Sequence, residues 1–273
     1  MLHKMIRVLL VGGDATTRDV LKAGVAVHRE NRYIELDAVD NKIDALEALS
    51  NKAFDIVFVD LDSSGQNGEE LFAAVKDTRS SSCLFIAISK IFDEKHASAL
   101  KQSGAYDFLQ KPFRQDEVSG IVATFMTMTV ACPILIVDDS ATMRKMTRKI
   151  LDESHFSFEI SEADCARSAL RLLSGGKIKI VLTDYHMPGG DGLELAGAIR
   201  DMSSKIGIYM MSTNDTTFLE RSAAFVGISG FLKKPFTSED INALMRNYYR
   251  MDAPVFGKTL DMFSFAANEK KAS

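Results

Sequence analysis

The chain has 273 residues and a formal net charge of −4, and 46% of its residues are hydrophobic. This length suits two ordinary domains, each able to bury its own core, and the composition is typical of globular proteins. The acidic balance argues against nucleic acid as the main partner, because binding a phosphate backbone requires a basic surface. The apolar runs are too short to cross a bilayer, and the apolar start continues into the domain pattern, so neither membrane insertion nor a signal peptide is expected.

The cysteines of the chain are Cys83, Cys132 and Cys165. They are too few and too scattered for a disulfide framework or a zinc site. We therefore expect reduced thiols in a cytoplasmic protein.

Short apolar runs mark the strands expected in the first half of the chain. They are Arg7–Val11, Ile34–Ala38, Ile56–Val59, Leu84–Ile88 and Tyr106–Leu109. The runs are continuously apolar rather than alternating, which is typical of parallel strands buried on both faces of a sheet. Helical patterns separate the runs, and the last helix of this half is expected from about Arg114 to about Met128.

The second half shows the same alternation of strands and helices. Its expected strands are Ile134–Val137, Phe158–Ser161, Ile180–Thr183, Ile206–Met211 and Gly230–Leu232. Ser140 and Thr237 are candidate N-caps, each followed by apolar residues at helical spacing. Repeated strand–helix alternation predicts a parallel, doubly wound α/β sheet in each half.

The two halves repeat each other in sequence. RVLLVGGDATTR matches PILIVDDSATMR, and GAYDFLQKPF matches GISGFLKKPF. Matched positions stay 123–126 residues apart along the chain. This pattern indicates a duplicated unit of about 120 residues, an ordinary domain size. We predict one domain at residues 1–129, a second at 130–250 and a tail at 251–273.

The predicted tail carries spaced apolar side chains. They are Phe256, Leu260, Phe263 and Phe265. The pattern fits a short helix docked on the second domain, a peptide captured by a partner, or a frayed end, and the sequence leaves these alternatives open.

Polar residues follow the expected strands of the second half. They are Asp138, Asp139, Asp184, Ser212 and Lys234. Because the carboxyl ends of parallel strands meet at one edge of a sheet, these side chains are expected to converge. Clustered carboxylates repel one another unless a cation joins them, and such oxygen-rich sites suit Mg²⁺. A carboxylate can also accept a phosphoryl group, whose charge an ammonium and a hydroxyl would then offset.

Four segments, IVDDSATMRK, TDYHMPGGDGLEL, MMST and FLKKPF, resemble the receiver domain of two-component response regulators, in particular chemotaxis-type single-domain regulators. The resemblance covers nearly all of residues 133–250 and, more weakly, residues 5–128. It implies two tandem flavodoxin-like (βα)5 domains with parallel strand order 2-1-3-4-5. In this family, phosphate comes from a phosphohistidine on a sensor histidine kinase or a phosphotransfer protein.

The resemblance also implies a role for each site residue. Asp184 would accept the phosphate, and Lys234 would contact it. Ser212 and Phe231 would act as the switch pair. The implied Mg²⁺ ligands are Asp139, Asp184 and the backbone carbonyl of His186, with Asp138 acting through a water molecule.

The first unit matches this pattern only in part. It keeps Asp60, Ser89 and Lys111, but Gly12 and Gly13 replace the acid pair. Glycine offers no side-chain oxygen, so this unit is predicted to be a degenerate receiver that does not turn over phosphate. Its expected role is interaction: docking a partner, forming a homodimer or controlling the second domain.

Three functions compete on this sequence. The preferred one is a non-enzymatic response regulator that signals to a downstream protein target without an attached output domain. A phosphate sink or relay, and a constitutive scaffold or dimerisation protein, are the alternatives. The string VDLDSS, with Asp60 and Asp62, also resembles the nucleophile loop of haloacid-dehalogenase-type phosphatases. The matching string TDYHMP lacks the second aspartate, which argues against a phosphatase.

Overall fold

The computed structural model describes residues 5–28, 33–62, 72–74, 83–91, 93–187, 192–213 and 226–255. The chain divides into two compact units, residues 1–126 with 252–273 and residues 127–251. The boundary after Met126 falls within a helix, and the segment that follows Met251 groups with the first unit. The four apolar tail residues singled out in the sequence lie outside the described part of the chain.

The first unit contains a five-stranded parallel sheet in the order β2-β1-β3-β4-β5. Its strands are β1 Ile6–Val11, β2 Ile34–Val39, β3 Ile56–Asp60, β4 Leu84–Ser89 and β5 Asp107–Gln110. Its helices are α1 Ala15–Ala26, α2 Lys42–Asn51, α4 Glu94–Gln102 and α5 Gln115–Met128. Central strands β3 and β4 are buried at every position, which explains why their sequences are apolar without alternation.

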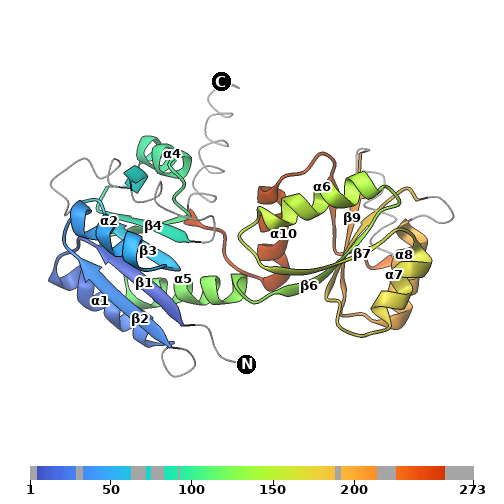
Figure 1. The fold of residues 1–273 in the computed structure, drawn as a ribbon, viewed down its shortest axis with the longest axis horizontal. Coiled ribbons are helices and arrows are strands. Elements are labelled where there is room, and N and C mark those ends of the chain that lie inside the picture. The colour runs from blue at the N-terminus through green and yellow to red at the C-terminus, as the bar shows by residue number, and fades with distance from the viewer. Residues whose placement is uncertain are drawn as a thin grey trace, which may run out of the picture. The chain divides into compact units, whose positions relative to one another are not determined.

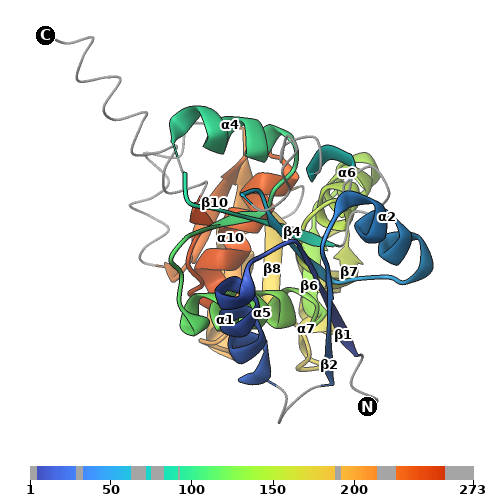
Figure 2. The same cartoon turned by 90° about the vertical axis from the view of Figure 1, so that its left-hand side faces the viewer.

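Helices cover both faces of the first sheet. Leu49 of α2 and Leu100 of α4 share a core with Leu9 of β1. On the opposite face, α1 approaches α5 so closely that a Cβ atom on Gly24 would lie 2.6 Å from Cβ of Val118. Figure 2 shows α1 and α2 on opposite sides of this sheet. The arrangement is the doubly wound one expected from the sequence.

The second unit contains the same kind of sheet, with the strands in the order β7-β6-β8-β9-β10. Its strands are β6 Cys132–Val137, β7 Phe158–Ala163, β8 Ile180–Asp184, β9 Gly207–Ser212 and β10 Gly230–Lys233. Its helices are α6 Ala141–Asp152, α7 Ala166–Leu173, α8 Gly192–Met202 and α10 Ser238–Tyr249. Counted within the unit, this is strand order 2-1-3-4-5 again, so the predicted fold is confirmed for both units.

Two helix pairs sandwich the second sheet (Figure 1). Leu173 of α7 and Leu195 of α8 pack in a core with Leu135 of β6. Leu151 of α6 and Met245 of α10 are also buried. The two predicted N-caps are confirmed. The Ser140 side chain accepts a hydrogen bond from the Met143 amide, and the Thr237 side chain accepts one from the Asp240 amide.

The expected strand ends agree with the structure to within one or two residues. Tyr106 and Ile206, expected as the first residues of their strands, each lie one residue before the strand begins. Across the described ranges, every helix is too short or too polar to span a membrane.

Candidate functional site

Three carboxylates gather at the carboxyl edge of the second sheet. Asp138 and Asp139 follow β6, and Asp184 is the last residue of β8. One oxygen atom from each lies within 4.8 Å of the others. Asp138 is buried, Asp184 is intermediate and Asp139 is exposed, so the cluster opens to solvent on one side. Oxygen ligands at this spacing, with room for water, fit a hard cation such as Mg²⁺.

Lys234 places its ammonium group between two of these carboxylates. Its Nζ atom lies 3.0 Å from Oδ2 of Asp138 and 3.0 Å from Oδ1 of Asp184. The lysine follows β10, and its backbone N–H donates to the carbonyl of Ser212 at 2.7 Å, which ties the ends of β9 and β10 together. The ammonium offsets the repulsion between carboxylates that burial would otherwise make costly.

The two oxygens of Asp184 have different surroundings. Oδ1 accepts from Lys234 and from the Tyr185 backbone N–H, the latter at 3.0 Å. Among the residues that the structure describes, no group donates to Oδ2. The Asp184 side chain is 18% exposed. The described contacts therefore orient and charge-compensate one oxygen of the carboxylate, and the other oxygen has no donor among the described residues.

Arg144 stabilises the loop that carries Asp138 and Asp139 by hydrogen bonds to its backbone. The guanidinium donates to the carbonyl of Asp138 at 2.8 Å and to that of Asp139 at 3.3 Å. It also pairs with Glu162 of β7, whose pKa lies below its usual value of 4.5, chiefly because Arg148 donates to it and secondarily because Arg144 does. Arg144 was not among the residues predicted from the sequence, although the repeat carries an arginine at the same place in both units.

Gly192 is a second residue that the sequence analysis missed. A Cβ atom at this position would lie 2.4 Å from the carbonyl oxygen of Asp184, so only glycine fits without a shift of the backbone. Its N–H donates to the carbonyl of Tyr185 at 2.9 Å. The glycine thus lets the start of α8 close against the segment at Asp184 and Tyr185. The glycine-rich run GGDGLEL is the signal that could have found it.

The remaining predicted residues also lie near this edge. Ser212 ends β9 and is 2% exposed, and Phe231 of β10 is half-buried. His186 is exposed, and its ring meets the Tyr185 ring edge-on at 4.5 Å between centroids. The switch role of Ser212 and Phe231, and metal binding by the His186 carbonyl, stay predictions.

The corresponding edge of the first unit is built differently. Asp60 ends β3 with a side chain that is 0% exposed, and Lys111 donates to its Oδ2 at 2.5 Å. Gly12 and Gly13 have φ values of +80° and +88°, a backbone conformation that aspartates at those positions would adopt only with strain. Asp14 caps α1 by accepting from the Thr17 amide at 2.7 Å, as Ser140 caps α6. It therefore does not replace the missing acid pair in this structure.

Comparisons with known proteins agree with this geometry. A family model for the response regulator receiver domain matches the chain twice, at residues 8–123 and 134–246. Chemotaxis protein CheY of Pseudomonas aeruginosa is 33% identical over 108 residues, which cover 39% of this chain and 86% of that protein. Transcriptional regulatory protein FixJ of Bradyrhizobium diazoefficiens is 31% identical over 127 residues, which cover 46% of this chain and 61% of FixJ.

A solved structure shares the fold over both units. It is a two-component system response regulator/GGDEF domain protein, 24% identical, with a TM-score of 0.59, and the match covers 90% of this chain and 98% of the other. The two family matches together span most of the sequence. The chain therefore belongs to the response regulator receiver family and is a two-component response regulator with two receiver domains in tandem.

Proposed function

We propose that the second unit accepts a phosphoryl group on Asp184 from a phosphohistidine of a sensor histidine kinase or a phosphotransfer protein. The observation that carries this proposal is the asymmetry of the Asp184 carboxylate. Its Oδ1 atom is held by Lys234 and by a backbone N–H, and no described group donates to its Oδ2 atom. Such an arrangement orients a nucleophile before the donor arrives.

The transfer is a displacement at phosphorus. Oδ2 of Asp184 attacks, the new O–P bond forms as the P–N bond to the donor imidazole breaks, and the leaving imidazole takes up a proton. Lys234 stays within reach of the phosphoryl oxygens, and Ser212, buried at the end of the next strand, offers a hydroxyl. Asp138, Asp139 and Asp184 would hold Mg²⁺, which when bound supplies positive charge toward the transferred group.

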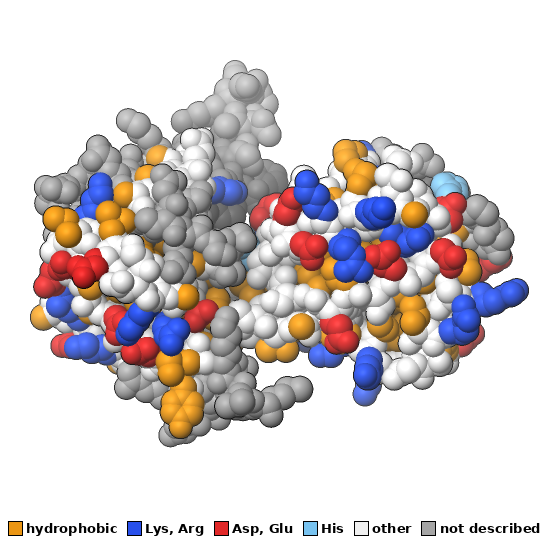
Figure 3. Space-filling model, viewed as in Figure 1, with side chains coloured by type: hydrophobic (Ala, Val, Ile, Leu, Met, Phe, Trp, Pro, Cys, Tyr) orange, Lys and Arg blue, Asp and Glu red, His pale blue; other side chains and the backbone are white. Residues whose placement is uncertain are grey.

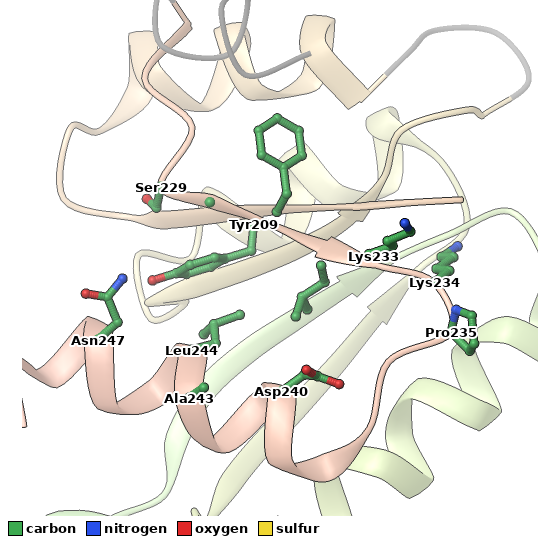
Figure 4. A pocket seen from close by; sticks show the side chains of 12 residues that line it. Tyr209, Ser229, Lys233, Lys234, Pro235, Asp240, Ala243, Leu244 and Asn247 are labelled. Atoms are coloured by element: carbon green, nitrogen blue, oxygen red, sulfur yellow. The ribbon is translucent and has the colours of Figure 1, made fainter. Parts of the chain in front are cut away.

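The signal would leave through the face formed by β10 and α10. A groove of about 620 Å³ lies there, lined in part by Phe231, Lys233 and Lys234 on the strand and by Leu244 and Asn247 on the helix. Figure 4 shows Lys234 at the end of the strand, next to Pro235, with the α10 side chains across the groove. The lysine thus belongs to the acceptor site and to the groove lining, which supports coupling between phosphorylation and partner binding. The fourth helix of this unit, expected between β9 and β10, falls on residues 214–225, which lie outside the described part of the chain.

The surface charge fits a protein target better than nucleic acid. On the face shown in Figure 3, basic and acidic side chains are interspersed over the described parts of both units. The net charge of −4 works in the same direction. We therefore propose a downstream protein target, and no enzymatic activity beyond self-phosphorylation and loss of the phosphoryl group.

The test is phosphorylation of the purified chain with acetyl phosphate and Mg²⁺, read by intact mass. We expect one added phosphoryl group that disappears in Asp184→Asn and persists in Asp60→Asn. Two phosphoryl groups would contradict the assignment of a single working acceptor. No phosphoryl group, with this donor and with phosphohistidine donors, would favour the constitutive scaffold instead.

A further inference from the structure

Asp62 reaches across the acceptor pocket of the first unit. It lies two residues after Asp60, and its Oδ1 atom accepts from the hydroxyl of Ser89 at 2.7 Å. Its Oδ2 atom accepts from the Lys90 backbone N–H at 3.0 Å and lies 3.5 Å from Nζ of Lys111. A single carboxylate therefore engages a hydroxyl, an amide and an ammonium group contributed by the ends of two strands.

These three donors are the groups that a phosphoryl group on Asp60 would need. Lys111 already touches Asp60 at 2.5 Å, and Ser89 ends the neighbouring strand, so a phosphoryl group on Asp60 would lie among the same donors. Asp62 supplies an anion in that place, with two acceptor oxygens and a negative charge. Carboxylates and phosphoryl oxygens accept charge-assisted hydrogen bonds from the same donors.

The second unit shows what the pocket is like without such an anion. His186 occupies the position that matches Asp62, and it is exposed with its ring against Tyr185. Lys234 contacts the acceptor Asp184 and the neighbouring Asp138. In the first unit the side chain of Asp62 thus fills the pocket, whereas the second unit has His186 at the matching position.

We propose that Asp62 is a built-in substitute for the phosphoryl group, so that the first unit is a permanently occupied receiver rather than an empty one. The proposal concerns the first unit alone and does not depend on phosphorylation of Asp184. Asp62 blocks the approach of a phosphodonor to Asp60 and at the same time holds the pocket in the arrangement that a bound anion produces.

The surrounding contacts agree with an occupied pocket. The Ile91 N–H donates to Oγ of Ser89 at 3.1 Å, so the hydroxyl that binds Asp62 also fixes the segment after β4. Phe108 of β5 is buried at 2% exposure, whereas its counterpart Phe231 in the second unit is only half-buried. The aromatic side chain is therefore the more deeply buried one in the unit whose pocket holds the anion.

Amide exchange and fluorescence in the full chain test the proposal. Asp62→Asn keeps the shape of the side chain but removes its charge and one acceptor oxygen. We expect amide exchange at Lys90 and Ile91 to become roughly tenfold faster, because the carboxylate protects one amide directly and the other through Ser89. Asp19→Asn, an exposed change on α1, is the control and is expected to leave both rates unchanged.

A tryptophan at position 108 provides the second readout, since the chain contains no other tryptophan. In a Phe108→Trp background, Asp62→Asn is expected to shift the emission to longer wavelength as the ring loses its buried position. Ser89→Ala, which removes the donor instead of the acceptor, is expected to produce the same shift. If exchange and emission stay unchanged in folded Asp62→Asn and Ser89→Ala proteins, Asp62 is only a local turn residue and the proposal is wrong.

Discussion

Asp60 and Asp184 end the same strand of two copies of one fold, yet their surroundings differ. Asp60 is completely buried, and its Oδ1 atom accepts from the amide of Asp62 at 3.0 Å while its Oδ2 atom is paired with Lys111. Asp184 is partly exposed, and only one of its oxygens is engaged by described groups. The first site therefore differs from the second in two ways. Asp60 makes additional contacts, and Gly12 and Gly13 stand in place of the acid pair. The described contacts thus place Asp60 in a packed, internally paired pocket and leave Asp184 partly exposed.

The loops after β1 and β6 support a second part of the comparison. Arg18 donates to the carbonyl of Gly13 at 2.9 Å, just as Arg144 donates to the carbonyls of Asp138 and Asp139. Each arginine also pairs with an acid, Asp40 in the first unit. The arginine support is therefore present in the loop with Gly12 and Gly13 as well as in the loop with Asp138 and Asp139. The hydrogen bonds that support this loop thus do not depend on the acid pair.

The largest expected difference between the units follows removal of the two lysines. Lys111→Ala leaves the Asp60 carboxylate buried without its ammonium partner, and we expect the first unit to lose about 3 kcal/mol or more of unfolding free energy. Mg²⁺ is not expected to restore this loss, because the glycine pair offers no ligand. Lys234→Ala is expected to cost the second unit less in Mg²⁺ than without it, because the three carboxylates there can share the cation.

Urea unfolding is monitored by hydrogen exchange of peptides from β3 and β8. Because β3 belongs to the first unit and β8 to the second, one sample gives the stability of each unit separately. Lys52→Ala is the matched control, since Lys52 forms exposed ion pairs with Glu35 and Asp37. We expect that change to cost at most about 1 kcal/mol. Equal, Mg²⁺-independent losses for Lys111→Ala and Lys234→Ala would contradict the distinction between a closed and an open site.

A smaller effect is expected from two glycines of α8. Gly192→Ala forces a methyl group against the Asp184 carbonyl, and we expect a loss of about 1–3 kcal/mol together with slower phosphorylation by acetyl phosphate. Gly197→Ala meets nothing within 4 Å and is expected to stabilise the same helix by about 0.5–1 kcal/mol. Urea midpoints and mass-detected phosphorylation rates measure both effects. Similar behaviour of the two variants would show that the close approach at Gly192 is unimportant.

The sequence predicted the fold of both units and the convergence of the carboxylates in the second. Strand positions follow from continuous apolar runs such as those of β3 and β8, and the carboxyl-edge rule brings Asp138 and Asp184 to one place. The contacts of Asp62 could not be predicted in this way. They depend on how the loop after β3 turns toward Ser89, and no periodic pattern encodes that turn. From the sequence alone, Asp62 was notable only as part of the string VDLDSS, which resembles a phosphatase nucleophile loop.

Gly192 and Arg144 were missed for a related physical reason. Each acts through backbone carbonyls, which every residue has, so its partners leave no mark in the sequence. The positive φ values at Gly12 and Gly13 likewise show that the first loop differs in backbone conformation as well as in side chains. Repeat comparison marks such positions, but the structure is needed to say what they do.

The smallest expected effect is an alkaline loss of stability in the second unit. Burial raises the pKa of the Cys132 thiol above its usual value of 9.0, and burial together with a hydrogen bond to Cys132 raises that of Tyr249 above 10.0. In the unfolded chain both groups release their protons at lower pH than in the folded one. The contribution of Cys132 to stability is therefore complete below about pH 9 and that of Tyr249 below about pH 10, and each is lost as the pH rises further toward the raised pKa of the folded state.

Urea unfolding midpoints of the second unit, followed through β8 peptides at about pH 7.5, pH 10 and pH 11, measure this loss. Tyr249→Phe removes one of the titrating groups and is expected to flatten the alkaline slope, whereas Tyr33→Phe, at an exposed tyrosine of the first unit, controls for loss of a hydroxyl group. An unchanged slope in Tyr249→Phe would assign the alkaline loss to other groups. A flattened slope would show that the pair formed by Cys132 at the start of β6 and Tyr249 at the end of α10 sets the upper pH limit of the unit proposed to carry the phosphate.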